Sequence, residues 1–224
     1  MNNIGTNIET VTRGLKKGVR LVAVSKFHPA TDLQAAYDAG QRIFGESHAQ
    51  EVTAKAATLP KDIEWHFIGH LQTNKVKYIA PFVSLIHSVD SLKLLKEIDR
   101  QGMKNDRAID CLLQIHIAKE ETKFGLSENE VHSILASEEY ARMRHIRICG
   151  IMCMATNTDD EEQIRQEFRQ VKGMFDRIKT RFFADAEHFK ELSMGLSDDY
   201  HIAMEEGSTL VRVGSKIFGE RTYA

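Results

Sequence analysis

The chain has 224 residues, of which 42% are hydrophobic and 28% are charged, so it has enough apolar material for one sizeable domain. Its 30 basic and 32 acidic residues leave a formal net charge of −2, whereas nucleic-acid-binding proteins usually have a basic excess. The sequence shows no apolar segment of the kind that directs export or crosses a membrane. We therefore expect a cytoplasmic protein that binds neither nucleic acid nor membrane.

Short apolar strands alternate with amphipathic helices along the whole sequence. The predicted strands cover residues 21–25, 43–45, 65–68, 83–86, 111–117, 146–154, 189–194 and 210–213. Residues 31–34 and 127–130 have the form of capping boxes, which begin two of the intervening helices. The clearest helix covers residues 159–182, where apolar residues recur at helical spacing. About eight βα units favour a single (β/α)8 TIM barrel over residues 1–224, with a doubly wound open sheet as the alternative.

Cysteine and histidine residues give no metal-site pattern. Cys111, Cys149 and Cys153 are an odd number without the paired spacing of zinc sites, so we expect buried free thiols. His66 and His70 are four residues apart, but they fall on a strand and a loop rather than on one helix. We expect no metal site.

Lys26 is the first candidate for chemistry, because it ends an apolar strand and barrel active sites lie at the carboxyl ends of the strands. A lysine partly withdrawn from water has a lowered pKa, and a neutral amine attacks an aldehyde to give a Schiff base. Position alone leaves open the alternative that the stem of this lysine packs while its ammonium group reaches water.

A phosphate site is predicted at the other end of the chain. Residues 193–197 (Ser-Met-Gly-Leu-Ser) follow the seventh strand, and residues 212–215 (Arg-Val-Gly-Ser) follow the eighth. Barrels often bind phosphate with these two loops and a short helix amino terminus, where glycine N–H groups and serine hydroxyls are donors. Arg212 lies in the same strand end, and pairing with a carboxylate such as Glu46 is the structural alternative for it.

Together these segments resemble the pyridoxal phosphate homeostasis proteins, whose barrel is of the alanine racemase N-terminal-domain type. The most specific match is residues 65–75, Trp-His-Phe-Ile-Gly-His-Leu-Gln-Thr-Asn-Lys. Residues 23–26 match the segment with the cofactor lysine, and residues 192–199 and 211–219 match the phosphate end. The resemblance spans essentially the whole chain.

The resemblance implies that pyridoxal 5′-phosphate is bound as a Schiff base to Lys26. It also implies phosphate contacts from Ser193, Gly214 and Ser215, with Arg212 facing the pyridine nitrogen. An arginine does not protonate this nitrogen, so the pyridine ring withdraws electrons less strongly than a pyridine ring whose nitrogen faces an aspartate. Such a ring suits holding the cofactor, or racemisation at most.

Two segments depart from the family pattern. The usual Gly-Glu-Asn-Tyr stretch here has Ser47 and His48 in its last two positions, and a position that is often basic is His28. We expect these departures to affect how tightly the cofactor is held and how it is transferred, rather than whether it is bound. Lys123 matches a lysine near the family site and is a candidate secondary acceptor.

Three functions are compatible with this sequence. The leading hypothesis is a monomer that holds pyridoxal 5′-phosphate, limits the free aldehyde and delivers it to apo-enzymes, without being an enzyme itself. The alternative is an amino-acid racemase, which needs an acid/base on each face of the substrate. In the resembling racemases the second base comes from a C-terminal β-domain, and we expect this chain to lack that domain. A sugar-phosphate barrel enzyme, in which Lys26 does not meet pyridoxal, is the third hypothesis.

Overall fold

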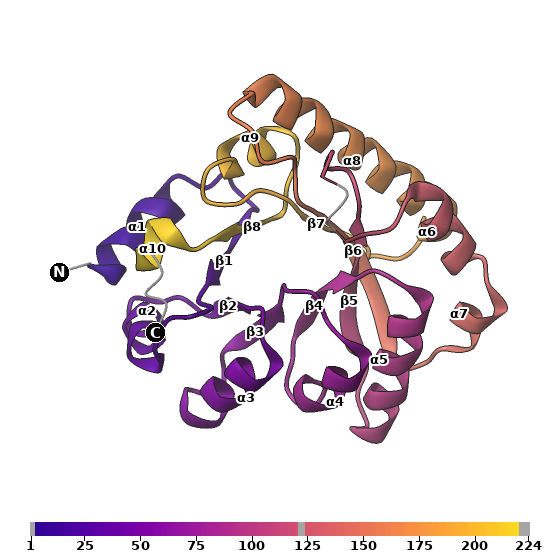
Figure 1. The fold of residues 1–224 in the computed structure, drawn as a ribbon, viewed down its shortest axis with the longest axis horizontal. Coiled ribbons are helices and arrows are strands. Elements are labelled where there is room, and N and C mark those ends of the chain that lie inside the picture. Colours follow the sequence, from indigo (N-terminus) through magenta and orange to yellow (C-terminus); the bar gives the residue numbers. More distant parts are fainter. Residues whose placement is uncertain (1–2, 121–123, 220–224) are drawn as a thin grey trace.

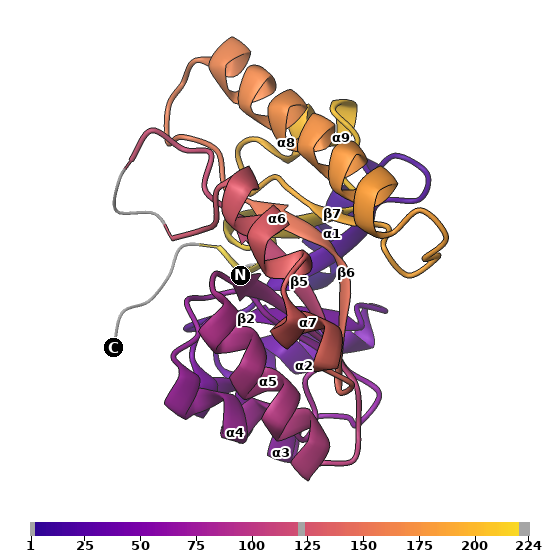
Figure 2. The same cartoon turned by 90° about the vertical axis from the view of Figure 1, so that its right-hand side faces the viewer.

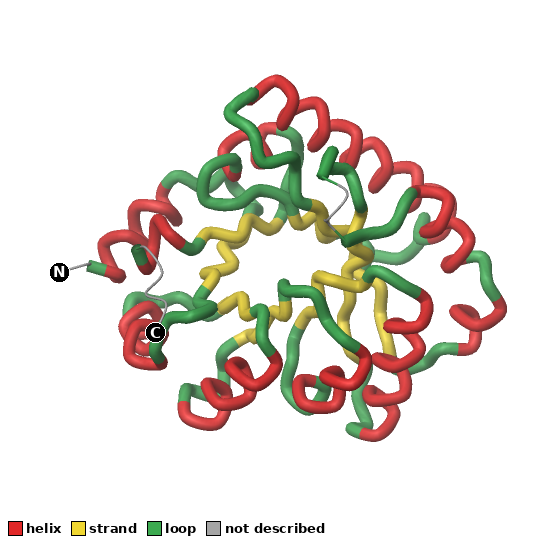
Figure 3. Tube along the Cα trace, viewed as in Figure 1, coloured by secondary structure: helices red, strands yellow, loops and turns green. Residues whose placement is uncertain are grey.

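The computed structural model describes residues 3–120 and 124–219, whose strands form a closed parallel barrel in which each strand pairs with the next and β8 returns to β1. Figure 1 looks down this barrel, and Figure 3 shows the strands as an inner ring with the helices outside it. The strands are β1 (Arg20–Val24), β2 (Ile43–Glu46), β3 (Glu64–Phe67), β4 (Leu85–Val89), β5 (Ile109–Ile115), β6 (Ile146–Cys153), β7 (Glu191–Ser193) and β8 (Leu210–Val213).

Helices connect successive strands and cover the outside of the barrel. They are α1 (Ile4–Arg13), α2 (Ala30–Asp38), α3 (Ala49–Thr58), α4 (Val76–Ile79), α5 (Leu92–Lys104), α6 (Glu128–Leu135), α7 (Glu138–Arg142), α8 (Glu161–Phe182), α9 (Tyr200–Glu205) and α10 (Ser215–Phe218), with a 3-10 turn at Thr73–Lys75. Figure 2, at right angles to Figure 1, shows α8 on the side of the barrel opposite α3 and α4. In the part of the chain that the structure describes, no helix has the length and apolar character that a membrane crossing requires.

Strands β1 and β8 close the barrel and bring the two ends of the chain together. Ala23 pairs with Val213 in the parallel register, so the residues that follow the two strands lie side by side. Helix α10 lies beside α1 (Figure 1), and the Asn7 side-chain amide donates a hydrogen bond to the Ile217 carbonyl at 2.9 Å. The predicted lysine segment and the predicted phosphate segment therefore share one rim of the barrel.

The main apolar core lies between the strands and the helices, whereas the barrel interior is apolar only in part. A small second cluster contains Val22, Leu85, Leu112, Cys149, Met152 and Leu210. The polar side chains of His66, His87, Ser193 and Arg212 are also buried, and they contact one another across the barrel. Part of the interior volume is thus filled by a hydrogen-bonded polar group.

The predicted barrel and all eight of its strands are confirmed, and the open-sheet alternative is wrong. The Ser127 capping box and the three buried free cysteines are also confirmed. The capping box predicted at Thr31 is wrong, because α2 begins at Ala30 after the N-cap residue Pro29. Proline has a fixed φ suited to a helix start and needs no N–H partner, so Thr31 falls inside the first turn. Helix α1, before the first strand, was not predicted from the sequence.

Candidate functional site

A cavity of about 650 Å³ opens at the carboxyl ends of the strands. Four predicted site residues line it: Lys26, Arg212, Gly214 and Ser215. Its volume is within the range of small-molecule sites, about 300–1,000 Å³. The barrel therefore brings the candidate amine and the candidate phosphate loop to one concave surface.

Lys26 follows β1 directly and its side chain is half-buried at this cavity. The next residue, Phe27, has a φ of 67°, which is rare for a residue with a side chain. The Phe27 ring lies 5.1 Å from the His48 ring, and both rings line the cavity. A tight, strained turn thus places Lys26 at the mouth of the barrel.

The loops after β7 and β8 meet at Ser197 and Gly214. The Gly214 N–H donates a hydrogen bond to the Ser197 hydroxyl at 3.2 Å, and both residues line the cavity. A Cβ atom at Gly214 would lie 3.2 Å from the Val24 carbonyl oxygen, so a side chain there would crowd β1. Helix α10 begins at Ser215. The backbone N–H groups and hydroxyls at this corner suit an anionic phosphate.

Arg212 is 2% exposed and reaches the cavity from β8. Its guanidinium donates to the Ser193 carbonyl at 3.0 Å, to the Ser193 hydroxyl at 2.5 Å and to the Cys153 carbonyl at 2.8 Å. Burial lowers the pKa of this guanidinium. The carboxylate alternative is not realised at Glu46, which instead contacts Lys55 at 2.7 Å. Neutral oxygen acceptors of Ser193 and Cys153 therefore fix the Arg212 guanidinium, while the residue also lines the cavity.

Two buried histidines extend this contact across the barrel. His87 Nδ1 lies 3.0 Å from the Ser193 hydroxyl, and His87 Nε2 lies 3.0 Å from His66 Nδ1. Burial lowers the pKa of His66 to about 3 and lowers that of His87 well below its usual value, so both rings are neutral near pH 7. Arginine only donates, so the Ser193 hydroxyl accepts from Arg212 and keeps its own proton for a bond to His87. We assign the matching tautomers, in which His87 donates from Nε2 to His66 Nδ1 and the His66 proton is on Nε2.

Ser193 is therefore placed differently from what the sequence suggested. It is fully buried under Arg212, whereas Ser197, four residues later, lines the cavity. The signal for Ser197 was present in the same Ser-Met-Gly-Leu-Ser segment. Strand β7 ends at Ser193, so this side chain belongs to the barrel interior and the second serine to the loop.

The residues that depart from the family pattern are divided between two environments. Ser47 and His48 line the cavity, whereas His28 packs against the Phe218 ring at 5.0 Å and contacts Asp32 at 3.6 Å. Lys123 lies outside the described residues. Within residues 3–120 and 124–219, no group of three or more His, Cys, Asp or Glu side chains is arranged to hold a metal ion.

His66 and His70 are also separated. His66 contacts His87 in the barrel interior, whereas His70 lies at the cavity and contacts Asp90 at 3.2 Å. The His70 ring stacks on Phe124, with 3.9 Å between the ring centroids. The spacing of these two histidines therefore reflects two different contacts rather than one shared ligand.

Comparison with known proteins agrees with this geometry. The family model described as alanine racemase, N-terminal domain, matches residues 1–222. The pyridoxal phosphate homeostasis protein of Aquifex aeolicus is 36% identical over 91% of this chain and 88% of its own length. That of Escherichia coli K12 is 36% identical over 92% of this chain and 87% of its own length.

Solved structures show the same relationship. PipY of Synechococcus elongatus with pyridoxal phosphate bound is 32% identical, with a TM-score of 0.88 over 96% of this chain and 100% of PipY. An alanine racemase from Bartonella henselae shares the fold, at 16% identity and a TM-score of 0.72, and this chain covers 59% of it. The chain therefore belongs to the pyridoxal phosphate homeostasis proteins, within the family defined by the alanine racemase N-terminal domain.

Proposed function

We propose that this chain holds pyridoxal 5′-phosphate as a Schiff base on Lys26 and thereby serves intracellular homeostasis of the cofactor. The observation that carries this proposal is that Lys26, Arg212, Gly214 and Ser215 line the same cavity. Support also comes from PipY, a 32% identical relative with pyridoxal phosphate bound.

The residues present fit the chemical groups of this cofactor. Lys26 supplies the amine for its aldehyde, and Ser197, Gly214 and Ser215 supply donors for its phosphate. Arg212 faces the pyridine nitrogen in this proposal, with Ser193 supporting it from beneath rather than contacting the phosphate. When bound, the cofactor supplies a reactive aldehyde, and the protein keeps that aldehyde away from other amines.

A holding and delivering role agrees better with these residues than catalysis does. A guanidinium facing the ring nitrogen leaves it unprotonated and therefore limits carbanion stabilisation. The relatives at 36% identity are named homeostasis proteins, whereas the racemase match at 16% supports the fold alone. We propose that the protein is a cytoplasmic monomer that delivers the cofactor to apo-enzymes.

The absorption spectrum with added pyridoxal 5′-phosphate, before and after borohydride, tests the binding. The wild type should show a visible band that borohydride removes, with the reduced adduct on the peptide that contains Lys26. Lys26→Ala should stay folded and lose the band, whereas Lys93→Ala, which removes an exposed lysine, should keep it. A wild type without a band, or an adduct elsewhere, would overturn the proposal.

Delivery needs a separate measurement. Loaded protein is mixed with an apo-enzyme that requires the cofactor, in the presence of an excess of an aldehyde scavenger. Direct transfer activates the apo-enzyme despite the scavenger, whereas release into solution does not. Activation that the scavenger abolishes would limit the function to holding the cofactor.

A further inference from the structure

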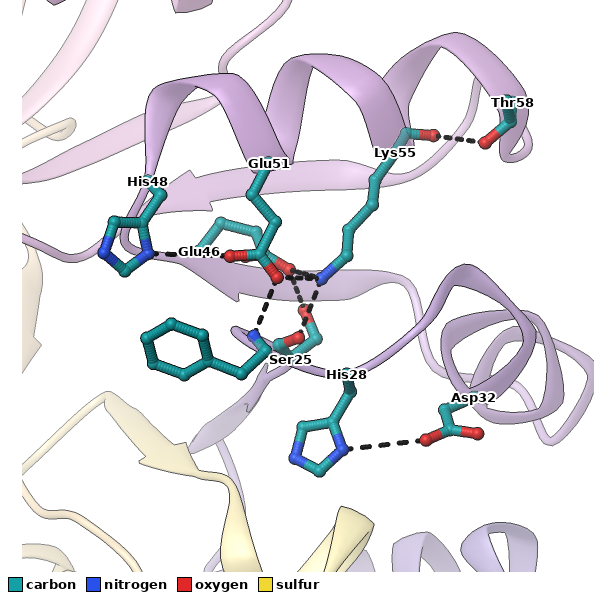
Figure 4. A network of polar contacts seen from close by, with 9 residues as sticks. Ser25, His28, Asp32, Glu46, His48, Glu51, Lys55 and Thr58 are labelled. Atoms are coloured by element: carbon teal, nitrogen blue, oxygen red, sulfur yellow. Dashed lines mark hydrogen bonds and ion pairs between the residues drawn. The ribbon is translucent and has the colours of Figure 1, made fainter. Parts of the chain in front are cut away.

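Three charged side chains lie behind the turn that bears Lys26: Glu46 of β2 and Glu51 and Lys55 of α3 (Figure 4). The Lys55 ammonium lies 2.7 Å from a Glu46 oxygen and 2.7 Å from a Glu51 oxygen. The side chains of Glu46 and Lys55 are 0% and 8% exposed. These three residues, here called the clamp, form one connected ionic group.

The clamp is bonded to the residue on each side of Lys26. The Ser25 hydroxyl donates to Glu46 at 2.6 Å, and the Ser25 carbonyl accepts from Lys55 at 2.9 Å. The Phe27 N–H donates to Glu51 at 2.7 Å. Figure 4 shows these bonds converging on the turn from one side. The backbone that bears Lys26 is thus fixed before and after the lysine by a single charged group.

Phe27 shows why such a clamp is needed. Its φ of 67° lies in the left-handed region, which is unfavourable for an aromatic residue and persists only where surrounding contacts enforce it. The bond from its N–H to Glu51 is such a contact. Buried ion groups are weak evidence for stability, because apolar replacements are often as stable. The position of the clamp therefore points to placement of the turn rather than to the fold as a whole.

We propose that Glu51 and Lys55, together with Glu46, are positioning residues that hold the Lys26 turn in the geometry for attack on an aldehyde in the cavity. This inference rests on the proposed function. All three lie outside the set of described residues that line the cavity. They reach it through the backbone of residues 25–27, and Glu51 also contacts the lining residue His48 at 3.5 Å. In the step that they assist, the neutral Lys26 amine adds to the aldehyde carbon. A C–N double bond then forms, and the aldehyde oxygen leaves as water with the two amine protons.

Glu51→Ala tests the clamp at its least buried member, which is 22% exposed. We measure the rate of Schiff-base formation with pyridoxal 5′-phosphate and, separately, the affinity for 4-deoxypyridoxine 5′-phosphate, which has no aldehyde. Loss of the bond to Phe27 should slow formation about tenfold, the effect of losing one bond to a charged group. The affinity for the analogue should change less than about twofold, because the phosphate corner is untouched.

Two matched variants separate positioning from damage to the helix. Glu51→Gln keeps an acceptor oxygen for the Phe27 N–H and should restore the rate to within about threefold of wild type. Gln50→Ala removes the exposed neighbour on the same helix and should have the wild-type rate. A rate for Glu51→Ala equal to wild type, or an equal loss of rate and analogue affinity, would overturn the inference.

Phe27→Gly provides a double-mutant test. Glycine adopts a positive φ without strain, so adding Glu51→Ala in the Phe27→Gly background should slow formation less than about threefold. A full tenfold loss in both backgrounds would show that Glu51 does not act through Phe27. A wild type that forms no adduct on Lys26 contradicts the proposed function, whereas a normal wild type with an unaffected Glu51→Ala contradicts the clamp alone.

Discussion

The backbone N–H of Gly214 donates a hydrogen bond to the Ser197 hydroxyl, with 3.2 Å between the two atoms. This bond joins the loops after β7 and β8 at the wall of the cavity. It preorganises two donors that a bound phosphate would share. Ser197 lines the cavity whereas Ser193 is buried beneath it, so we propose Ser197 as the serine that contacts the phosphate.

Exchanging the two serines for alanine should therefore have different effects. Ser197→Ala should weaken binding of pyridoxal 5′-phosphate about tenfold, since one hydrogen bond to a charged group is lost, with little change in stability. Ser193→Ala should lower the free energy of unfolding by about 1–3 kcal/mol, because Arg212 and His87 lose a buried partner. Ligand titration and urea unfolding distinguish the two. A greater loss of affinity in Ser193→Ala than in Ser197→Ala would show that Ser193 is the serine that contacts the phosphate.

Arg212→Met should shift the absorption band of the bound cofactor without preventing Schiff-base formation on Lys26. It should also lower the free energy of unfolding by about 3 kcal/mol, because the carbonyls of Ser193 and Cys153 lose their donor. Spectra and denaturant titration of the same samples measure both effects. Arg212→Lys retains a charge and is the matched control, with a smaller loss of stability expected. An unchanged spectrum would exclude the role at the ring nitrogen.

The buried histidines predict a loss of stability as the pH falls. In the folded state the pKa of His66 is lowered to about 3 by burial, so below its ordinary value of 6.5 the unfolded chain takes up the proton first. The stabilisation is complete above pH 6.5 and decreases with falling pH, by about 1.4 kcal/mol per pH unit for each such histidine. Urea unfolding between pH 6.5 and about 5 covers this window, above the range where most carboxylates titrate.

The matched variants for this measurement are His66→Asn and His201→Gln. Asparagine keeps an acceptor for His87 but does not titrate, so the slope should decrease by about 1 kcal/mol per pH unit. His201→Gln removes an exposed histidine and should keep the wild-type slope. Burial raises the pKa of Glu46, which acts in the opposite direction, so the difference between variants is the decisive quantity. Equal slopes in wild type and His66→Asn would contradict the neutral histidine pair.

Gly69→Ala should weaken both the fold and ligand binding. An added Cβ would lie 2.6 Å from the Ser47 Cβ and 2.7 Å from the Ser47 carbonyl oxygen, so the two cavity loops would have to separate. Overpacking of this kind costs about 1–3 kcal/mol, which thermal unfolding detects. Gly173→Ala, inside α8, meets only the end of the Arg177 side chain and should stabilise the protein by up to about 1 kcal/mol. Wild-type stability and ligand affinity in Gly69→Ala would show that the cavity loops tolerate the extra atom.

Local patterns predicted the strands well, because apolar runs and turn residues are sufficient to mark them. Closure of the barrel depends on pairing between β1 and β8, which no local window contains. The sequence predicts the wrong start for α2, because the Thr-x-x-Gln pattern at Thr31 begins only two residues after Pro29, which is the actual N-cap residue. Lys26, Arg212, Gly214 and Ser215 were placed at one rim by the rule that strand carboxyl ends share an edge, and the cavity agrees with that placement.

The polar interior could not be predicted, since each of its contacts joins distant strands. His66 pairs with Leu85 in the β3–β4 register, so His87, two residues further along β4, faces the same side of the sheet. No local pattern in either strand predicts that the two rings meet, and Ser193 joins them only through β7. The clamp of Glu46, Glu51 and Lys55 depends in the same way on how α3 packs against the turn after β1.

The junction of β1 and β8 has a consequence for folding. It joins segments near opposite ends of the chain, and contacts of such large sequence separation have the greatest entropic cost of loop closure and tend to form late. A ligand attached to Lys26 after β1 and to Gly214 after β8 would crosslink the two strands at this junction. Each tenfold excess of such a ligand over its dissociation constant adds about 1.4 kcal/mol against opening of the ring. Cofactor occupancy should therefore slow amide exchange in β1 and β8 most, making the loaded protein a more tightly closed ring than the empty one.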